Sequence, residues 1–293
     1  MTDRLPPLRE RLLGEARRLS VPIDMVELDY GLSYVLAAVF TNEALKDSLV
    51  FKGGTALRKA YFPDYRFSVD LDFTALGGPR GDALEQNMVD VARETERLLG
   101  EYGPFMVSSS RRTERSFHPA GQEAFLIKVQ FPWHRSRLRS IKIEITVDEP
   151  LMLVAASRPL LHRYGESLAV SLRSYRLEEI VAEKLRTLLQ AQKRVDEGKW
   201  ARNCARDYYD LWHLCRLPSD AFDRVAVAAI LPQKCAVRGV SFGGVADFFP
   251  PLIVSEAARQ WETSLADLVR PLPDFETVMA GLHESLTALL GGR

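Results

Sequence analysis

Residues 68–73, Ser-Val-Asp-Leu-Asp-Phe, alternate between polar and apolar side chains. Successive side chains of a β-strand point to opposite faces. The pattern therefore predicts a strand that buries Val69, Leu71 and Phe73 on one face. Asp70 and Asp72 would share the other face, with Cα atoms about 6.5–7 Å apart. Aspartate is uncommon in strands, and two like charges on one face repel each other unless a cation lies between them. The segment by itself is equally compatible with a cation site and with an ordinary solvated strand face.

Mg²⁺ fits this aspartate pair, because it binds carboxylate oxygens together with substrate phosphates. Residues 140–148 show a second clean alternation, which places Glu144 on another strand. Taken alone, Glu144 resembles a surface residue. Beside Asp70 and Asp72 it becomes the best third ligand, with Asp148 as the alternative. Three such carboxylates could hold two metal ions about 3.5–4 Å apart, one for an attacking hydroxyl and one for a leaving pyrophosphate.

A glycine pair follows a short apolar strand candidate, in the sequence Lys52-Gly53-Gly54-Thr55. Glycine lets the backbone approach a ligand closely. The helix predicted over residues 55–61 begins with unpaired N–H groups, which favour phosphate. By itself such a pair is more often structural, so this motif is a weak indication of phosphate binding.

The C-terminal half carries charged residues on two predicted helices. Lys184 lies on or beside the apolar stripe of the amphipathic helix over residues 177–194. It could extend its ammonium to the surface or direct it into a cleft and meet a triphosphate. Asp207 and Asp210 share one face of the next helix and could be solvated or pair with Arg206 or Lys184.

The remaining sequence patterns predict an α/β (α+β) fold followed by helices. Helices are expected over 5–19, 24–46, 83–100, 219–230, 253–268 and 273–290, and strands over 104–112, 123–132 and 139–148. After Pro150 the strand signal fades. We predict a core domain with N-terminal helices over residues 1–172 and a helical C-terminal domain over residues 173–293.

Composition excludes several classes of protein. The three cysteines, Cys204, Cys215 and Cys235, show no CxxC spacing, and their odd number argues against a disulfide framework. A reducing cytoplasm is the predicted location. No stretch of about 18 uncharged apolar residues predicts a membrane span, and the N-terminus lacks the apolar run of a signal peptide.

The formal net charge is zero, but its distribution is uneven. Residues 111–206 contain 19 Lys and Arg against 11 Asp and Glu, which suits a polyanionic partner such as RNA. Phe117, Phe125, Phe131 and Trp133 lie in this segment and could stack on bases. The alternation of Phe125 and Phe131 instead favours the core of a sheet.

Four motifs occur in a fixed order: FKGGTALRKAYF, RFSVDLDF, EEIVAEKLRTLLQ and RDYYDLW. In combination, over about residues 24–215, they resemble the AbiEii/AbiGii-type abortive-infection toxins of the polymerase-beta-like nucleotidyltransferase superfamily. The resemblance implies a polymerase-beta-like mixed sheet with flanking helices and a helical C-terminal domain. It also implies an enzyme of the EC 2.7.7 type that uses an NTP and Mg²⁺, or Mn²⁺.

The resemblance assigns roles to residues of the first two motifs. Gly53 and Gly54 match the glycine pair that holds the incoming triphosphate, with Lys52 and Thr55 beside them. Ser68 matches the hydroxyl residue just ahead of the metal-binding aspartates.

The aspartates Asp70 and Asp72 match the metal-binding, catalytic pair of the family. Lys184 matches a motif lysine that contacts nucleotide. Asp207 matches the catalytic aspartate of the RD-xx-D motif, and Asp210 its partner.

This sequence departs from the family pattern in two places. Glu144 stands where the third carboxylate is commonly aspartate. Residues 195–203, VDEGKWARN, form an insertion-like stretch between the two motif helices.

Members of the family act as toxins beside a separate antitoxin, often a winged-helix repressor, and some extend the 3′ end of tRNA and block translation. The implied partners are therefore an NTP, an RNA acceptor such as tRNA and a cognate antitoxin, with no membrane. Protein nucleotidylylation, antibiotic modification and a non-catalytic nucleotide-binding module remain open alternatives. The intact Asp70 and Asp72 favour turnover.

Ser68 precedes Asp70 by two residues and so lies on the same predicted strand face. Phosphorylation would add about −1.5 to −2 charge there, which should displace the triphosphate. Ser68 is therefore a candidate phosphorylation switch.

Overall fold

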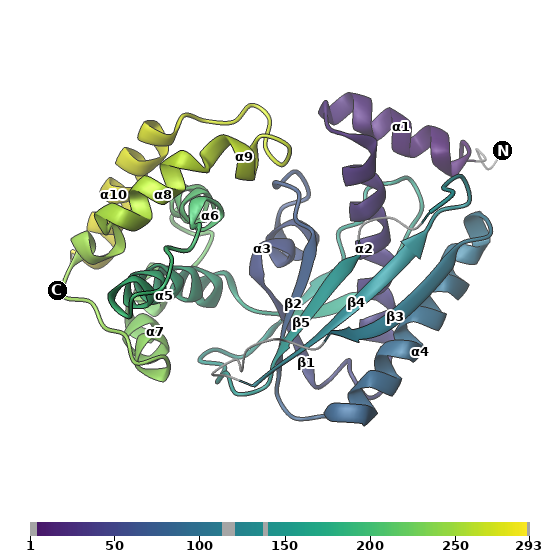
Figure 1. Ribbon diagram of the computed structural model, residues 1–293, viewed down its shortest axis with the longest axis horizontal. Helices are drawn as coiled ribbons and strands as arrows, with labels where there is room; N and C mark the ends of the chain where they lie inside the picture. Colours follow the sequence, from purple (N-terminus) through teal and green to yellow (C-terminus); the bar gives the residue numbers. More distant parts are fainter. Residues whose placement is uncertain (1–4, 113–120, 137–139, 292–293) are drawn as a thin grey trace. The chain divides into compact units, whose positions relative to one another are not determined.

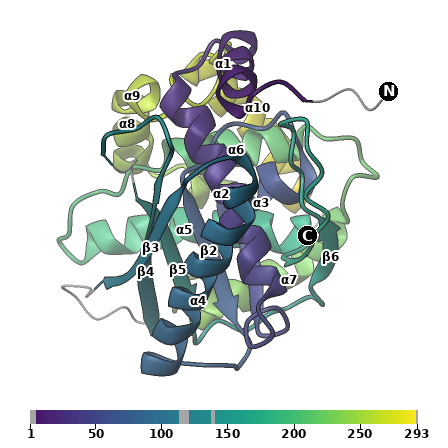
Figure 2. The same cartoon turned by 90° about the vertical axis from the view of Figure 1, so that its right-hand side faces the viewer.

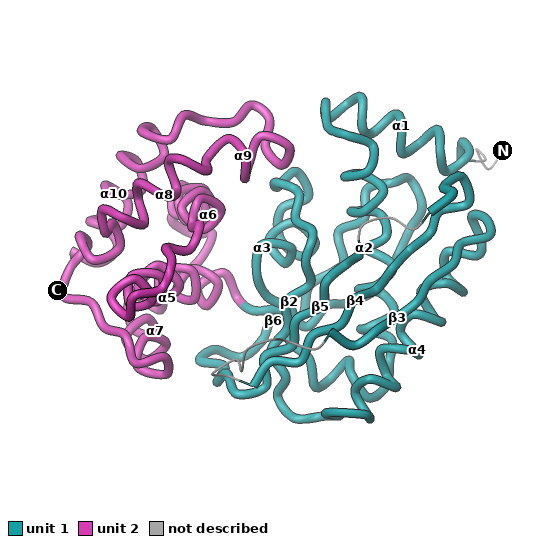
Figure 3. Tube along the Cα trace, in the orientation of Figure 1, with its two compact units in different colours: residues 1–175 teal, residues 176–293 magenta. Residues whose placement is uncertain are grey.

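The computed structural model describes residues 5–112, 121–136 and 140–291. The chain divides into two compact units, residues 1–175 (unit 1) and residues 176–293 (unit 2), which Figure 3 shows in different colours. Unit 1 contains a seven-stranded mixed sheet with flanking helices, and unit 2 is helical (Figure 1). The predicted α/β fold class is confirmed.

Unit 1 begins with two helices, continues with strands and helices in turn as far as η2, and ends with five consecutive strands. Its elements are α1 (Leu8–Leu19), α2 (Ile23–Thr41), β1 (Leu49–Lys52), α3 (Gly53–Ala56), η1 (Leu57–Tyr61), β2 (Asp70–Ala75), α4 (Gly81–Leu99), η2 (Gly100–Tyr102), β3 (Met106–Arg112), β4 (Gln122–Gln130), β5 (Ile141–Thr146), β6 (Ala156–Pro159) and β7 (Ser171–Ser174). The strand order is β3-β4-β5-β2-β1-β7-β6. The central strand β2 pairs antiparallel with β1 and parallel with β5.

One face of the sheet is apolar and buried. In β2 and β5 the residues Leu71, Phe73, Ile143 and Ile145 are fully buried and pair with one another in register. Helix α2 lies against this face, where a side chain at Gly31 would contact Val129 and Ile141 of the sheet. Helix α4 packs on β3 beside α2 (Figure 2). The polar residues of β2 and β5 are therefore on the opposite face.

Two short strands and several boundaries differ from the sequence prediction. Strands β6 and β7 are not predicted, because each has four residues and lacks an apolar alternation. The helix expected over 219–230 runs from Arg224 to Val237 instead, since Asp223 caps its first turn by accepting from the backbone N–H groups of Val225 and Ala226. The helix expected over 253–268 consists of two helices, α8 (Pro251–Arg259) and α9 (Trp261–Leu265).

A buried ion-pair network joins α2 to the turn after α3. The carboxylate of Asp29 accepts from Nε of Arg58 at 2.8 Å, from Nζ of Lys59 at 2.7 Å and from the hydroxyl of Tyr164 at 2.6 Å. Burial alone would raise the pKa of Asp29, but the charges of Arg58 and Lys59 outweigh it, so the pKa lies well below its ordinary value. Asp29 remains ionised and fixes the helical turn that follows the glycine pair.

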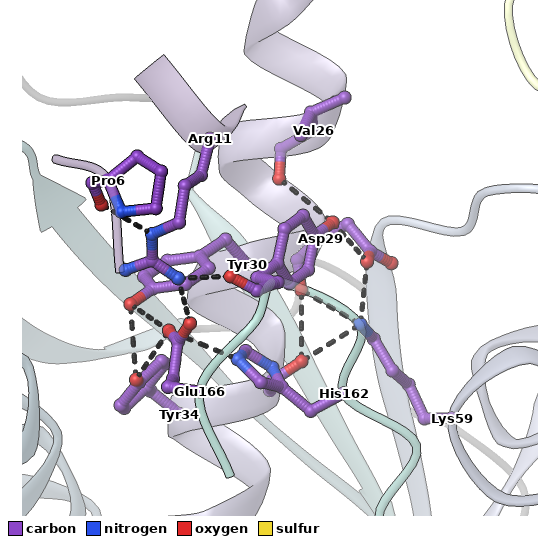
Figure 4. A network of polar contacts seen from close by, with 11 residues as sticks. Pro6, Arg11, Val26, Asp29, Tyr30, Tyr34, Lys59, His162 and Glu166 are labelled. Carbon is purple, nitrogen blue, oxygen red and sulfur yellow. Dashed lines mark hydrogen bonds and ion pairs between the residues drawn. The ribbon is translucent and has the colours of Figure 1, made fainter. Parts of the chain in front are cut away.

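A second network surrounds Glu166, in the segment between β6 and β7 (Figure 4). Its carboxylate accepts from the hydroxyls of Tyr30 at 2.6 Å and Tyr34 at 3.1 Å and pairs with Arg11 of α1. Nε2 of His162 lies 3.2 Å away. Burial would raise the pKa of Glu166, but these hydrogen bonds lower it to about 2. The network ties the segment before β7 to α1 and α2.

Replacing Glu166 with glutamine should change how stability depends on pH. The folded-state pKa of about 2 lies below the ordinary value of 4.5. The stabilisation by the ionised carboxylate is therefore complete above pH 4.5 and is lost as the pH falls toward 2. We expect the difference in unfolding free energy between wild type and Glu166→Gln, roughly 3 kcal/mol at pH 7, to shrink over this interval. Denaturant titrations at several pH values would measure it, and a constant difference would contradict the assignment.

Unit 2 is built from helices with a mostly apolar core. Its elements are α5 (Leu177–Asp196), α6 (Ala205–Cys215), α7 (Arg224–Val237), η3 (Val245–Phe248), α8, α9 and α10 (Phe275–Leu290). Glu179 of α5 and Lys234 of α7 are both completely buried and form an ion pair at 2.8 Å. This pair joins α5 to α7 in the centre of the unit.

The structure also shows the surroundings of the aromatic residues and cysteines noted in the sequence. Phe125 and Phe131 are buried in the sheet core, which confirms that interpretation, whereas Phe117 lies outside the described residues. The three cysteines are buried free thiols. Among the helices of the described part of the chain, none is both long and apolar enough to cross a bilayer.

Candidate active site

Three charged residues form a row across the polar face of the sheet. Asp72 of β2 lies directly opposite Lys52 of β1 on one side and Glu144 of β5 on the other. Asp70 occupies the same face two residues earlier, opposite Lys142. The aspartates alternate with the buried Leu71 and Phe73, as predicted. The β2–β5 register therefore brings the predicted third carboxylate next to the aspartate pair.

Positive side chains balance these carboxylates. Lys142 and Glu144 lie two residues apart on β5, and Nζ of Lys142 forms an ion pair with the Glu144 carboxylate. Nζ of the mostly buried Lys52 lies 5.6 Å from the ring centre of Tyr175. The phenol of Tyr175 is hydrogen-bonded to Thr74 of β2 at 2.7 Å. The row thus places two neighbouring carboxylates, Asp72 and Glu144, on adjacent strands, with Lys52 beside Asp72 and Lys142 paired to Glu144.

The predicted glycine turn lies against this row. Gly53 has φ +78°, a left-handed conformation that favours glycine. A side chain there would also overlap the Asp72 carboxylate. The next residues continue as a short helix, and the hydroxyl of Thr55 donates to the carbonyl of Asp70. Lys52, Gly53 and Thr55 are therefore held close to the aspartates by backbone geometry and one side-chain hydrogen bond.

Ser68 and Arg66 lie beside the second glycine. A methyl group on Gly54 would be 3.5 Å from the Ser68 hydroxyl and 2.6 Å from Nη2 of Arg66. Arg66 is absent from the residues predicted for the site. The signal for it is present, because residues 66–73 continue one alternation in which Arg66, Ser68, Asp70 and Asp72 occupy every second position.

The carboxylates offer a partial metal site. Asp70 and Asp72 share a face of the sheet with Glu144, which is in register with Asp72. Their carboxylate oxygens are the kind of ligand that Mg²⁺ binds. Within residues 5–112, 121–136 and 140–291, no group of three or more His, Cys, Asp or Glu side chains is gathered closely enough to hold a metal ion alone. Mg²⁺ sites commonly use one or two carboxylates and complete their coordination with water and substrate phosphates. The donor set fits such a shared site. Asp148 lies beyond the end of β5 and is exposed.

The other predicted residues meet inside unit 2. Nζ of Lys184 on α5 lies 2.6 Å from Oδ2 of Asp210 and 3.0 Å from Oδ1 of Asp207, both on α6. Asp210 is completely buried, and Lys184 and Asp207 are each 9% exposed. The guanidinium of Arg202 is 3.6 Å from the second oxygen of Asp207. The two motif helices thus hold one ammonium between two carboxylates, despite residues 197–204 between them.

Comparisons with known proteins identify the family. The family model for the nucleotidyl transferase AbiEii toxin of type IV toxin–antitoxin systems matches residues 34–281. No curated protein gives a significant match. Among solved structures, the nucleotidyltransferase toxin MenT4 from Mycobacterium tuberculosis H37Rv superposes with a TM-score of 0.61 at 22% sequence identity. The match covers 98% of this chain and 89% of MenT4 and supports the same fold.

The matched residues include the glycine turn, the aspartate pair, Lys184 and Asp207. The resemblance carried by the four sequence motifs is confirmed and extends into the last helix. Nucleotidyltransferases of this kind use an NTP and a divalent metal ion. The chain belongs to the AbiEii family of nucleotidyltransferase toxins of type IV toxin–antitoxin systems.

Proposed function

We propose that this toxin transfers the nucleoside monophosphate of an NTP to a hydroxyl of an RNA acceptor, with the 3′ end of tRNA as the expected acceptor. Translation would stop because the modified tRNA cannot be used. The observation that carries the proposal is the row of Lys52, Asp72 and Glu144, with the glycine turn packed against Asp72. The excess of basic residues in the segment 111–206 supports a polyanionic acceptor. The proposed place of action is the cytoplasm, where a cognate antitoxin would counteract the toxin.

In the proposed mechanism the triphosphate lies along the glycine turn. Gly53 and Gly54 present no side chain, so the phosphates can approach the backbone, with Lys52 and Thr55 on either side. The acceptor oxygen attacks the α-phosphorus in line as the bond to the leaving pyrophosphate breaks. Positioning and charge neutralisation supply most of the rate enhancement.

Asp70 and Asp72 are the proposed ligands of Mg²⁺, or Mn²⁺, and Glu144 is the proposed third ligand. When bound, the ion would polarise the phosphates and activate the acceptor hydroxyl. Glu144 already pairs with Lys142, so this lysine would have to share or release the carboxylate.

Lys184 is the proposed cation for the charge that develops on the phosphates. Asp207 and Asp210 accept from its ammonium and limit the orientations it can take. This arrangement supports roles for Lys184 and Asp207 in catalysis and for Asp210 in positioning the lysine.

Label transfer would test the acceptor class. The protein is incubated with each α-labelled NTP, Mg²⁺ and either total RNA or total cell protein. Label in RNA, concentrated in the tRNA fraction and at 3′ ends, is the expected result. Label in protein would instead support protein nucleotidylylation, and label only in an added antibiotic would support antibiotic modification. NTP binding without transfer to any acceptor would support a non-catalytic module.

Ser68 offers a test of regulation at the same site. Replacing Ser68 with glutamate adds a negative charge beside Gly54, where the triphosphate is proposed to bind. We expect the KM for NTP to rise by about fivefold or more, because one like charge at close range costs about 1 kcal/mol or more. Ser68→Gln is the matched control, because it adds a side chain of the same size without the charge, and it should raise the KM for NTP less than Ser68→Glu does. Full activity of Ser68→Glu would exclude a phosphorylation switch.

A further inference from the structure

Gly54 lacks a side chain for a different reason from Gly53. The backbone of Gly54 does not have the positive φ that Gly53 has, so its conformation is open to other residues. The obstacle is Arg66, because a methyl group on Gly54 would come within 2.6 Å of Nη2. Glycine at position 54 therefore makes room for the guanidinium of Arg66.

The guanidinium is held in place from several sides. Arg66 is buried, with 6% of its surface exposed. Its Nη1 donates to the carbonyl of Phe67 at 3.1 Å, and its guanidinium lies 5.8 Å from the ring centre of Tyr65. A buried arginine held in this way has few rotamers left, so its position beside the turn is largely fixed before any ligand binds.

The two glycines consequently lie next to opposite charges. Gly53 packs on the carboxylate of Asp72, whereas Gly54 packs on the guanidinium of Arg66. A triphosphate needs the same pair of environments, since the reacting phosphorus needs metal-bearing carboxylates and the terminal phosphates need cations. Arginine suits the second role, because its planar fork can donate two parallel hydrogen bonds to one phosphate.

We propose that Arg66 binds the terminal phosphates of the NTP and the pyrophosphate that they become. This inference rests on the proposed nucleotidyl transfer and adds a phosphate-binding residue to it. Arg66 would recognise the triphosphate, whatever the base, and would make the site prefer an NTP over an NMP. The Ser68 hydroxyl lies beside the same turn, so both groups would face the phosphate chain.

Direct binding measurements test the proposal separately from catalysis. Dissociation constants for each NTP and its NMP are measured with Mg²⁺ by titration calorimetry for the wild type, Arg66→Met and Arg66→Lys. We expect the wild type to bind NTP more tightly than NMP, and Arg66→Met to reduce this preference at least tenfold with little change for NMP. Arg66→Lys should keep part of the preference, and the concentration of inorganic pyrophosphate that inhibits transfer by half should rise in parallel.

Arg158→Met is the matched control. Its guanidinium lies 4.6 Å from the ring centre of Tyr61, and its Nε donates to the carbonyl of Ala60. This partly buried arginine of unit 1 should leave the NTP preference unchanged. If Arg66→Met weakened NTP binding and NMP binding equally, Arg66 would have a structural role. That result would overturn this inference but not the proposed function. A wild type without any preference for NTP would overturn the proposed function as well.

A double-mutant cycle tests the contact without nucleotide, including when Arg66→Met folds poorly. Gly54→Ala should lower the melting temperature of the wild type, because its methyl group meets the guanidinium. In an Arg66→Ala background the same substitution should have little effect or raise the melting temperature. Equal effects in both backgrounds would show that Arg66 does not occupy the space at Gly54, and would contradict the proposal.

Discussion

Replacing Asp70 with asparagine is expected to lower nucleotide transfer by about 1000-fold, which corresponds to about 4 kcal/mol in the activation free energy. Asparagine keeps the size of the side chain but removes the charge that would hold the metal ion against the phosphates. Asp70 lies at the start of β2 on the polar face of the sheet. Initial rates at saturating NTP, repeated over a range of Mg²⁺ and Mn²⁺ concentrations, would measure the loss.

The matched control for this substitution is Asp90→Asn. Asp90 lies on α4, is partly exposed and pairs only with the nearby Arg93 among the ion pairs described for it. Its removal should leave transfer unchanged and alter stability by less than about 1 kcal/mol. Transfer by Asp70→Asn within threefold of wild type would remove the basis for placing the metal at the aspartate pair.

Replacing Asp29 with asparagine is expected to lower the free energy of unfolding by about 3–5 kcal/mol at pH 7. The carboxylate of Asp29 is 3% exposed and compensates two buried cations, Arg58 and Lys59. Without it, both positive charges would remain buried and incompletely paired. Equilibrium denaturation followed by circular dichroism would measure the loss.

The pH dependence gives a second test of the Asp29 assignment. The pKa of Asp29 is lowered in the folded state. The ionised carboxylate therefore stabilises the fold fully above the unfolded-state pKa of about 3.9, and this stabilisation is lost as the pH falls below that value. The difference in unfolding free energy between wild type and Asp29→Asn should therefore become smaller below about pH 4. Asp64→Asn breaks an exposed ion pair with Arg163 and should cost less than about 1 kcal/mol. Similar losses for Asp64→Asn and Asp29→Asn would contradict the special role of the buried network.

The sequence alone predicts much of the fold, because its clearest elements have strong periodic patterns. The alternation around Asp70 and Asp72 gives β2 and its polar face, and the alternation around Glu144 gives β5. The amphipathic helix that carries Lys184 is found nearly at its observed bounds. In each case a local pattern of burial determines the element, so no knowledge of distant contacts is needed.

Other features depend on contacts that no local pattern encodes. β7 contains only Leu172 as a buried apolar residue, and it is formed by antiparallel pairing with β6 and by the parallel pair of Ser174 with Phe51 of β1. Asp29 falls within a buried helix, and only the fold reveals that Arg58 and Lys59 neutralise it. The sequence leaves Asp207 and Asp210 solvated, paired with Arg206 or paired with Lys184, and the α5–α6 packing selects the pairing with Lys184.

Strands that are neighbours in the sheet are far apart in the chain, since β1 lies between β2 and β7. The proposed site is therefore completed only late in synthesis. Lys52 is made early, but Glu144 follows about 90 residues later, and β7 begins only at Ser171. At about 10 residues per second the ribosome needs roughly 10 seconds to cover this distance. A nascent chain released before β5 has the glycine turn and both aspartates but lacks the strand on the far side of β2. We therefore expect abandoned translation products of this length to be harmless to the cell that makes them.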